Sequence, residues 1–106
     1  MAKFNLKEYE TLIDKGMASH TKKILFLPSP NPGYLYITNE RVVFDPTQGK
    51  PDSAFEYSLS DLDSFSVGFA STITLMKKDG KKLTLTGSAN KKLIAALETA
   101  GVQKSS

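Results

Sequence analysis

The stretch GYLYITNERVVFDP, Gly33 to Pro46, decides the fold of this chain. In its first half, Leu35 and Ile37 alternate with aromatic and hydroxyl side chains, which is the period-two pattern of a strand. Val42 and Phe44 repeat this pattern after an Asn-Glu dipeptide. Two alternating runs separated by about two turn residues predict a β-hairpin, with these four apolar side chains on its buried face.

Four more alternating runs follow this hairpin, over residues 54–59, 64–69, 71–78 and 81–87. Alternation places Phe55 and Tyr57 on one face of the first run, and Phe65, Val67 and Phe69 on one face of the second. In the last two runs, the residues expected to point inward are Ile73, Leu75, Leu83 and Leu85. Between the last two runs, Asp79 and Gly80 form a two-residue hairpin signal. After Ser88 the apolar period becomes helical, and Gly101 marks the expected stop. The second half of the chain therefore predicts four strands and a C-terminal helix.

On the N-terminal side of the hairpin, the run KKILFLP (22–28) predicts one further strand. The segment PSPNPG (28–33) that closes this run holds three prolines, and it predicts a stiff loop without regular structure. Further upstream, Asn5 and Glu8 have the capping-box spacing, and apolar residues recur at helical intervals from Leu6 to Met17. These residues predict a helix over 6–15.

Taken together, a helix, about seven strands and a second helix predict an α+β, mainly β domain, in which antiparallel strands form two packed sheets or a barrel. The chain has 106 residues, which is the usual length of one domain. We expect an N-terminal helix over residues 1–18, packed on or beside the domain. The domain itself is expected over 19–102, followed by a loose tail over 103–106.

The composition is that of an ordinary globular protein, with 40% apolar and 24% charged residues. There is no cysteine, no N-terminal secretory signal, and no apolar run near the roughly 20 residues that a membrane span needs. We therefore expect a cytoplasmic protein without disulfides. The net charge of +3 is a mild excess, and Arg41 is the only arginine. This charge pattern favours solubility or weak anion attraction over nucleic-acid binding.

The segment MKKDGKK (76–82) is the strongest candidate for a binding site. Lys77, Lys78, Lys81 and Lys82 flank its Asp-Gly pair, and strand alternation lets only some of them converge. Each lysine near an anionic membrane adds about 1 kcal/mol of attraction, which salt screens. The hairpin is therefore either a solvated turn whose charges prevent edge pairing or a site of weak, salt-sensitive anion contact.

Three other groups of residues are weaker candidates. His20 is the only histidine, so it lacks partners for catalysis or metal binding, and its place before a strand favours a surface or strand-edge position. Asp61 and Asp63 lack the further oxygen ligands of a calcium loop and are expected to accept backbone hydrogen bonds. Tyr34 and Tyr36 share one face, where they either stack on a ligand or an interface, or fill the core of a second sheet.

No phosphate-binding glycine loop, nucleophile elbow, zinc motif or dinucleotide fingerprint occurs in the sequence. We therefore expect no enzymatic activity, no cofactor, no metal and no small-molecule substrate, and we do not expect nucleic acid as a partner. A small enzyme that depends on His20 is the alternative left open.

The hairpin Gly33–Pro46 resembles the GRAM domain, a member of the PH-like superfold. GRAM domains carry a similar glycine, an alternating aromatic-aliphatic strand, a Thr-Asn turn, a basic residue and an apolar strand that ends in phenylalanine. FEYSLSDLDSFSV, Phe55 to Val67, is similar to the next strand of that family and its polar crossing, and the likeness extends over about Ser19 to Val102. The resemblance implies a PH-like barrel of about seven antiparallel strands with a C-terminal capping helix, to which the N-terminal helix is an addition.

The resemblance also implies a function, because PH-like and GRAM domains commonly bind membranes, phosphoinositides or protein partners. In PH domains the usual lipid site is a basic loop between the first two strands. The loop PSPNPG here has no lysine or arginine, and Lys22 and Lys23 before it supply only part of such a site. We expect a non-enzymatic PH-like/GRAM interaction module that binds a protein partner or itself through a sheet edge or the N-terminal helix. The alternative is peripheral binding to anionic membrane lipid through the Lys77–Lys82 hairpin, which would place the protein at the membrane surface.

Overall fold

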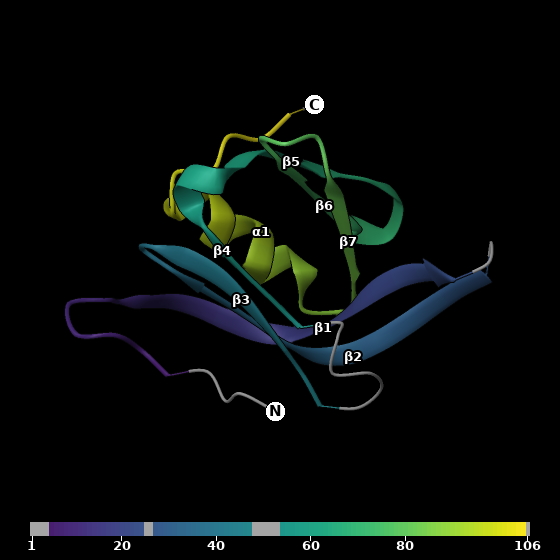
Figure 1. Ribbon diagram of the computed structural model, residues 1–106, viewed down its shortest axis with the longest axis horizontal. Helices are drawn as coiled ribbons and strands as arrows, with labels where there is room; N and C mark the ends of the chain where they lie inside the picture. The colour runs from purple at the N-terminus through teal and green to yellow at the C-terminus, as the bar shows by residue number, and fades with distance from the viewer. Residues whose placement is uncertain (1–4, 25–26, 48–53, 106) are drawn as a thin grey trace.

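The computed structural model describes residues 5–24, 27–47 and 54–105, and for residues 22–24 and 27–30 it describes the backbone alone. The described chain forms seven strands and one α-helix (Figure 1). They are β1 (Leu12–Ile24), β2 (Leu27–Thr38), β3 (Arg41–Pro46), β4 (Phe55–Ser58), β5 (Leu62–Val67), β6 (Ile73–Lys77), β7 (Lys82–Thr86) and α1 (Asn90–Thr99). Two short 3₁₀ turns, η2 (Leu59–Asp61) and η3 (Phe69–Ser71), lie between strands. The predicted mainly β fold with about seven antiparallel strands and a C-terminal helix is thus confirmed.

All seven strands belong to one sheet, in the order β4-β3-β2-β1-β7-β6-β5. Both halves of the sheet share β1, because it pairs with β2 along its whole length and with β7 from Ser19 to Thr21. Figure 1 shows β1 to β4 as the lower half and β5 to β7 as the upper half, with α1 between them in this view. The sheet therefore bends back over its own buried face into a barrel-like shape.

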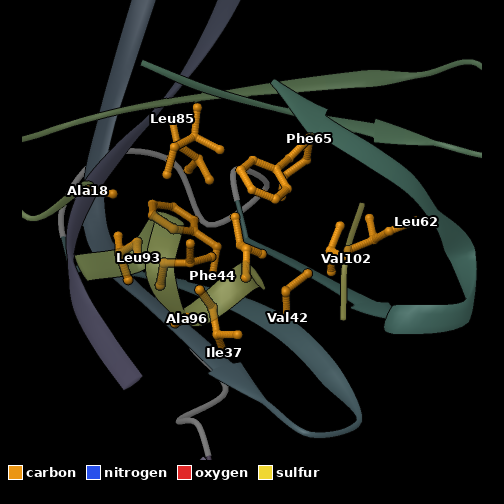
Figure 2. Packing of buried hydrophobic residues seen from close by; sticks show 14 of the residues in the cluster. Ala18, Ile37, Val42, Phe44, Leu62, Phe65, Leu85, Leu93, Ala96 and Val102 are labelled. Atoms are coloured by element: carbon orange, nitrogen blue, oxygen red, sulfur yellow. The ribbon is translucent and has the colours of Figure 1, made fainter. Parts of the chain in front are cut away.

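The buried faces of both halves and of α1 form one hydrophobic core (Figure 2). Phe44 comes from the lower half, Phe65 and Leu85 come from the upper half, and Leu93 comes from α1. Each of these side chains is at most 1% exposed. Burying an apolar side chain of this size contributes about 1.5 to 3 kcal/mol. The core therefore holds the two halves of the sheet and the helix in one arrangement.

The hairpin predicted from Gly33–Pro46 is the pair β2–β3. Leu35 lies opposite Phe44 and Ile37 lies opposite Val42, and all four side chains are buried. The turn falls on the Asn-Glu dipeptide between the two strands. The prediction is confirmed in its turn and its buried face.

Most of the large apolar residues that alternate in the later runs lie in or against the core, and Phe69 is the clear exception. The buried ones are Phe55, Phe65, Ile73, Leu75 and Leu85, and the half-buried ones are Tyr57, Val67 and Leu83. Phe69 is 95% exposed. The strand β5 ends at Val67, and the chain then turns through η3, where Ala70 and Ser71 have left-handed φ angles of 56° and 62°. The alternating pattern of the sequence thus continues past the point at which the strand stops.

The helix predicted over residues 6–15 is wrong. Residues from Leu12 onward belong to β1, which runs without interruption through residue 18 to Ile24, and residues 5–11 contain only a turn. In this turn Tyr9 has a φ of 69°, which lies outside the helical region. Helical spacing is a local preference, and here the pairing of β1 with β2 over its whole length outweighs it.

The prolines of PSPNPG lie in a strand rather than in the predicted loop. Pro28, Pro30 and Pro32 occupy alternate positions of β2, so their backbone nitrogens all point to the same side of the strand. The carbonyl oxygen of Pro32 accepts a hydrogen bond from Thr47 N (3.0 Å), which places this side away from β1. The partner strand β3 has already ended opposite Gly33. The missing N–H groups therefore face an edge, where proline is tolerated.

The C-terminal residues also differ from the predicted loose tail. The N–H of Phe65 donates to Gln103 O (2.9 Å), and the N–H of Ser105 donates to Phe65 O (2.8 Å). These bonds bring the chain beside β5, with a parallel bridge between Phe65 and Lys104. Residues 103 to 105 are therefore held against the edge of the sheet, because β5 offers them unpaired backbone groups.

Candidate functional site

The lysine hairpin joins β6 to β7, as predicted, but its turn differs from the expected two-residue turn. The N–H of Lys77 donates to Lys81 O (2.9 Å) and that of Gly80 donates to Lys77 O (2.9 Å), so the loop contains three residues. Gly80 has a φ of 91°, and Asp79 Oδ1 accepts a hydrogen bond from Lys81 N (2.9 Å). A tight turn that ends in a glycine with a left-handed conformation, as this one does at Gly80, is a common form of three-residue hairpin loop.

The four lysines of this hairpin do not converge on one site. The Lys77 side chain is only 15% exposed, and its Nζ lies 4.0 Å from the centre of the Tyr57 ring and 3.4 Å from Asp79 Oδ2. The other three lysines are exposed. A shallow depression beside the turn is lined by Lys77 and Lys78, but also by Asp61 and Asp79. These carboxylates offset part of the positive charge that an anionic ligand would meet.

Lys22 and Lys23 belong to β1, where they lie opposite Ser29 and Pro28 of β2. Their side chains lie outside the described part of the chain. In Figure 1 the end of β1 projects at the right, whereas the β6–β7 turn lies at the top. The backbone positions of Lys22 and Lys23 are therefore not beside the lysine hairpin. These two residues and the four lysines of the hairpin do not form a single site.

The edge at β4 carries outward backbone groups that have no strand partner in the part of the chain that the structure describes. The β5 edge is partly covered by residues 103 to 105, and β2 lacks three N–H groups where it extends beyond β3. At the far side, β4 pairs only with β3. Because Leu59 N donates to Glu40 O (2.9 Å), alternation turns residues 55 and 57 toward β3. Both backbone groups of Glu56 and the N–H of Ser58 therefore point away from the sheet, whereas the C=O of Ser58 belongs to the start of the 3₁₀ turn η2.

Aromatic stacking holds β4 in a fixed position. The Phe55 ring stacks on Phe44 and on Tyr57, with centroid distances of 5.6 and 5.4 Å. On the opposite face of the strand, Glu56 Oε1 lies 3.2 Å from Arg41 Nη1. An edge supported on both faces is ordered before any partner arrives, which lowers the entropy cost of binding.

A buried ion pair that the sequence did not reveal joins the N-terminal segment to the β2–β3 hairpin. Arg41 Nε lies 2.7 Å from Glu10 Oε2, and Arg41 Nη2 donates to Glu10 Oε1 at 2.9 Å. Thr38 Oγ1 donates to Glu10 Oε2 at 2.6 Å, and both Glu10 and Arg41 are 7% exposed. These partners lie 31 residues apart, so no local pattern could have paired them. Because each charge is neutralised by the other, we interpret the Glu10–Arg41 ion pair as a structural contact rather than a reactive site, and we call it the clamp.

The clamp predicts a specific acid sensitivity. The hydrogen bond from Arg41 is the main cause that lowers the pKa of Glu10 from 4.5 to about 2. A carboxyl whose folded-state pKa is depressed stabilises the fold above its unfolded pKa. We therefore expect a loss on the order of 3 kcal/mol in the free energy of unfolding as the pH falls from about 4.5 to about 2.

Urea denaturation across this pH range, compared with the variant Glu10→Gln, measures that loss. The variant is expected to be less stable at neutral pH but to change less between pH 4.5 and 2, because it has no proton to gain at this position. Parallel decline of the two proteins would show that other carboxyl groups cause the acid sensitivity.

The weaker candidates from the sequence have mostly structural positions. His20 is 6% exposed, and Phe44 and Phe55 pack edge-to-face against its ring, so the expected surface position is wrong. Tyr34 and Tyr36 lie on the outer face of β2 with ring centroids 6.4 Å apart. Within the described residues, no group of three or more His, Cys, Asp or Glu side chains is placed to hold a metal ion. None of the helices in the described chain is long and apolar enough to cross a membrane.

Comparison with protein families gives a match that covers most of the chain. The sequence model of the GRAM domain matches residues 1–91. The chain belongs to the GRAM domain family. GRAM and PH-like domains generally mediate protein or lipid interactions and are generally not catalytic. The matched region includes the N-terminal segment and β1, so the similarity to the GRAM family begins well before residue 19, where the domain was expected to start.

Solved structures support the PH-like fold of this GRAM domain. The C-terminal domain of an unknown protein from Leishmania infantum superposes with a TM-score of 0.68 at 19% identity, over 88% of this chain and 85% of that one. The Vps36 N-terminal PH domain gives 0.61 at 18% identity, over 92% and 81% of the two chains. The PH domain of human pleckstrin homology domain-containing protein family A member 5 gives 0.59 at 9% identity, over 100% and 90%. No curated protein sequence matches the chain. At these identities the structures establish the fold alone.

Proposed function

We propose that this GRAM domain is a non-enzymatic interaction module that binds a protein partner by pairing an extended segment with the open edge of β4. The observation that carries this proposal is the outward orientation of the N–H and C=O groups of Glu56 and of the N–H of Ser58. Such groups pair readily with an added strand, and main-chain hydrogen bonds then supply affinity while side-chain pockets supply specificity. The partner is either another protein or a second copy of this chain.

Proline at position 58 tests this proposal with little disturbance of the fold. Ser58 has φ −58° and ψ 147°, which a proline ring accepts without strain. Ser58→Pro removes an outward N–H and places a ring at the edge, whereas Ser58→Ala keeps the N–H. We expect Ser58→Pro to reduce partner capture at least about fivefold, because a hydrogen bond of about 1 kcal/mol is lost and the ring obstructs the added strand. Ser58→Ala is expected to behave as the unmodified chain.

Capture can be measured with a photo-crosslinking amino acid at Glu56, in cells of the source organism. The same amino acid at Glu98, which is exposed on α1, serves as the control position. A product with twice the mass of the chain indicates self-association, and any other mass indicates a different protein. Products that form equally at both positions, or that persist in Ser58→Pro, would rule out the β4 edge as the binding site.

Contact of the Lys77–Lys82 hairpin with an anionic membrane is the second candidate. It is favoured by the exposure of Lys78, Lys81 and Lys82, for which the described part of the chain provides no ion-pair partner. It is weakened by the engagement of Lys77 with Tyr57 and by the neighbouring carboxylates. Loss of vesicle binding on charge reversal at Lys78 and Lys81 would assign membrane contact to this hairpin.

A further inference from the structure

The connection between β5 and β6 holds an aromatic side chain out into solvent. Phe69 is 95% exposed, the highest value among the large apolar side chains of the described chain. The next two residues, Ala70 and Ser71, both adopt left-handed backbone conformations, which cost free energy in residues other than glycine. Strained conformations of this kind persist only where the surrounding structure holds them, and they are concentrated at functional sites.

Four hydrogen bonds hold the connection in this shape. Thr72 donates to Phe69 O from both its Oγ1 (2.8 Å) and its backbone N–H (3.2 Å), and Gly68 N donates to Thr72 O (2.8 Å). Asn90, which is fully buried at the start of α1, donates from Nδ2 to Ser71 O at 2.8 Å. The base of the connection is thus fixed to the helix while Phe69 remains outside. The exposed ring is presented by an ordered turn, so little entropy is lost when it is buried.

The chain around Phe69 lacks the charged side chains that cover most of the surface. Residues 64–76, which contain the connection, include no Asp, Glu, Lys or Arg, and neither do residues 83–90, which lead into α1. The first charged residues after Asn90 are Lys91 and Lys92, and both are exposed. Lys92 Nζ lies 3.9 Å from Asp14, whereas Lys91 has no ion pair within the described part of the chain. The turn that carries Phe69 is therefore uncharged, and the basic residue Lys91 follows directly after Asn90, which holds the turn to α1.

We propose that the Phe69 turn is a membrane-contact site that inserts its ring into the interfacial layer of an anionic lipid bilayer, with Lys91 close to the headgroups. An uncharged tip enters this layer without removing a charge from water, and the ring then gains the transfer free energy of its apolar area. Attraction of the neighbouring lysine to anionic lipid adds to this. The inference goes beyond strand addition at β4 and does not depend on it.

A bilayer suits this geometry better than a protein pocket does. Phe69 lies on a turn between two exposed small residues, Gly68 and Ala70. A protein interface normally combines a central aromatic with an extended complementary surface. A single aromatic on a narrow, uncharged tip needs only a soft apolar layer, which a bilayer provides.

The chain contains no tryptophan, so Phe69→Trp creates a single fluorescent probe at the proposed contact. Tyr9→Trp is the matched control, because Tyr9 is 88% exposed but belongs to the N-terminal segment. Both proteins are titrated with vesicles of equal parts phosphatidylcholine and phosphatidylserine. We expect a blue shift, and quenching by lipids brominated in the upper acyl chain, for Phe69→Trp alone.

Sedimentation with the same vesicles measures the partition coefficient of variants without a probe. Phe69→Ser is expected to bind about tenfold more weakly than the unmodified chain, and Lys91→Glu about fivefold more weakly at low salt. Because Phe69 is exposed, circular dichroism and thermal unfolding should show that Phe69→Ser folds normally. Charge reversal at both Lys78 and Lys81, which lie at the other end of β6, should leave the blue shift of Phe69→Trp in place.

Three results would overturn the proposal. The first is the absence of a blue shift with anionic vesicles. The second is loss of vesicle binding on charge reversal at Lys78 and Lys81 with no effect of Phe69→Ser, which assigns membrane contact to the lysine hairpin. The third is a blue shift that grows with protein concentration in the absence of lipid, which assigns Phe69 to a contact between two copies of the chain.

Discussion

Replacing Arg41 by methionine is expected to lower the free energy of unfolding by about 3 to 5 kcal/mol at neutral pH. The variant leaves the buried carboxylate of Glu10 without its strongest partner, because Arg41 supplies two of the hydrogen bonds to this group. The bonds from Thr38 Oγ1 and Lys7 N remain, but they do not neutralise the charge. An uncompensated buried charge is among the few single changes that remove most of a small domain's stability.

Glu56→Gln is the matched control, because it removes the other ion pair of the same arginine. The Glu56 side chain is 54% exposed, so we expect this change to cost only about 0 to 1 kcal/mol. Both variants are measured by urea denaturation at pH 7. A loss in Arg41→Met no larger than that in Glu56→Gln would mean that water or a local rearrangement satisfies Glu10.

The double variant Glu10→Met with Arg41→Met separates the clamp's geometry from its charge. A buried ion pair is often replaceable by apolar side chains of similar volume, because two desolvated charges are removed together. We therefore expect the double variant to be more stable than Arg41→Met alone. Such recovery would show that the cost of the single change comes from the unpaired carboxylate.

The part of the fold that could be predicted from the sequence is the part that local patterns specify. The β2–β3 hairpin needs a period of two, a turn dipeptide and apolar residues on one face, and all of these lie within Gly33–Pro46. The helix α1 is similar, since Leu93 and Leu97 recur at helical spacing and both are fully buried. In these elements, local preference and tertiary packing favour the same structure.

The prediction failed where a distant segment decides the local structure. Residues 12–15 have helical spacing, but β2 pairs with them through its own residues 36–38. The three prolines of β2 are tolerated only because β3 ends opposite Gly33, a fact about another strand. The sequence pattern could not predict the strand over residues 12–15 or the prolines within β2, because each depends on the position of a segment more than ten residues away.

The candidate sites show the same division between residues and their surroundings. The lysines at 77 to 82 could be located from the sequence, but the pairing of Lys77 with Tyr57 and Asp79 could not. The open edge of β4 follows from the position of the other strands, and its residues carry no motif. Phe69 continues the alternation of Phe65 and Val67 in the sequence, but alternation cannot report that β5 ends at Val67. A binding surface is thus a property of the assembled sheet more than of any one segment.

Replacing Gly33 by alanine is expected to lower the free energy of unfolding by about 3 kcal/mol or more, near the upper end for overpacked sites. A Cβ at this position would lie 2.5 Å from the carbonyl oxygen of Asp45, 2.6 Å from Pro46 Cα and 2.9 Å from Phe44 Cζ. The first two atoms belong to the backbone of β3, which cannot turn aside as a flexible side chain can. The strand pair must therefore separate locally or shift.

Two other glycines show which property of Gly33 matters. Gly68 has φ −107° and its added Cβ would meet nothing closer than 3.9 Å, so Gly68→Ala should change stability by less than about 0.5 kcal/mol. Gly80 has φ +91° and open space around it, so Gly80→Ala should cost about 1 kcal/mol through backbone strain alone. Urea denaturation of the three variants compares them directly.

A loss in Gly33→Ala that exceeds the loss in Gly80→Ala would identify close backbone approach, rather than backbone conformation, as the reason for glycine here. That outcome also concerns binding, because β3 carries β4 on its other side. A displacement of Asp45 and Pro46 would pass along β3 to Phe44 and its stacked partner Phe55 at the start of β4. The glycine of the hairpin that specifies the fold would then also fix the position of the edge proposed to receive a partner. Equal losses in the two variants would mean that β3 accommodates the methyl group, and the edge of β4 would have to owe its position to the aromatic stack alone.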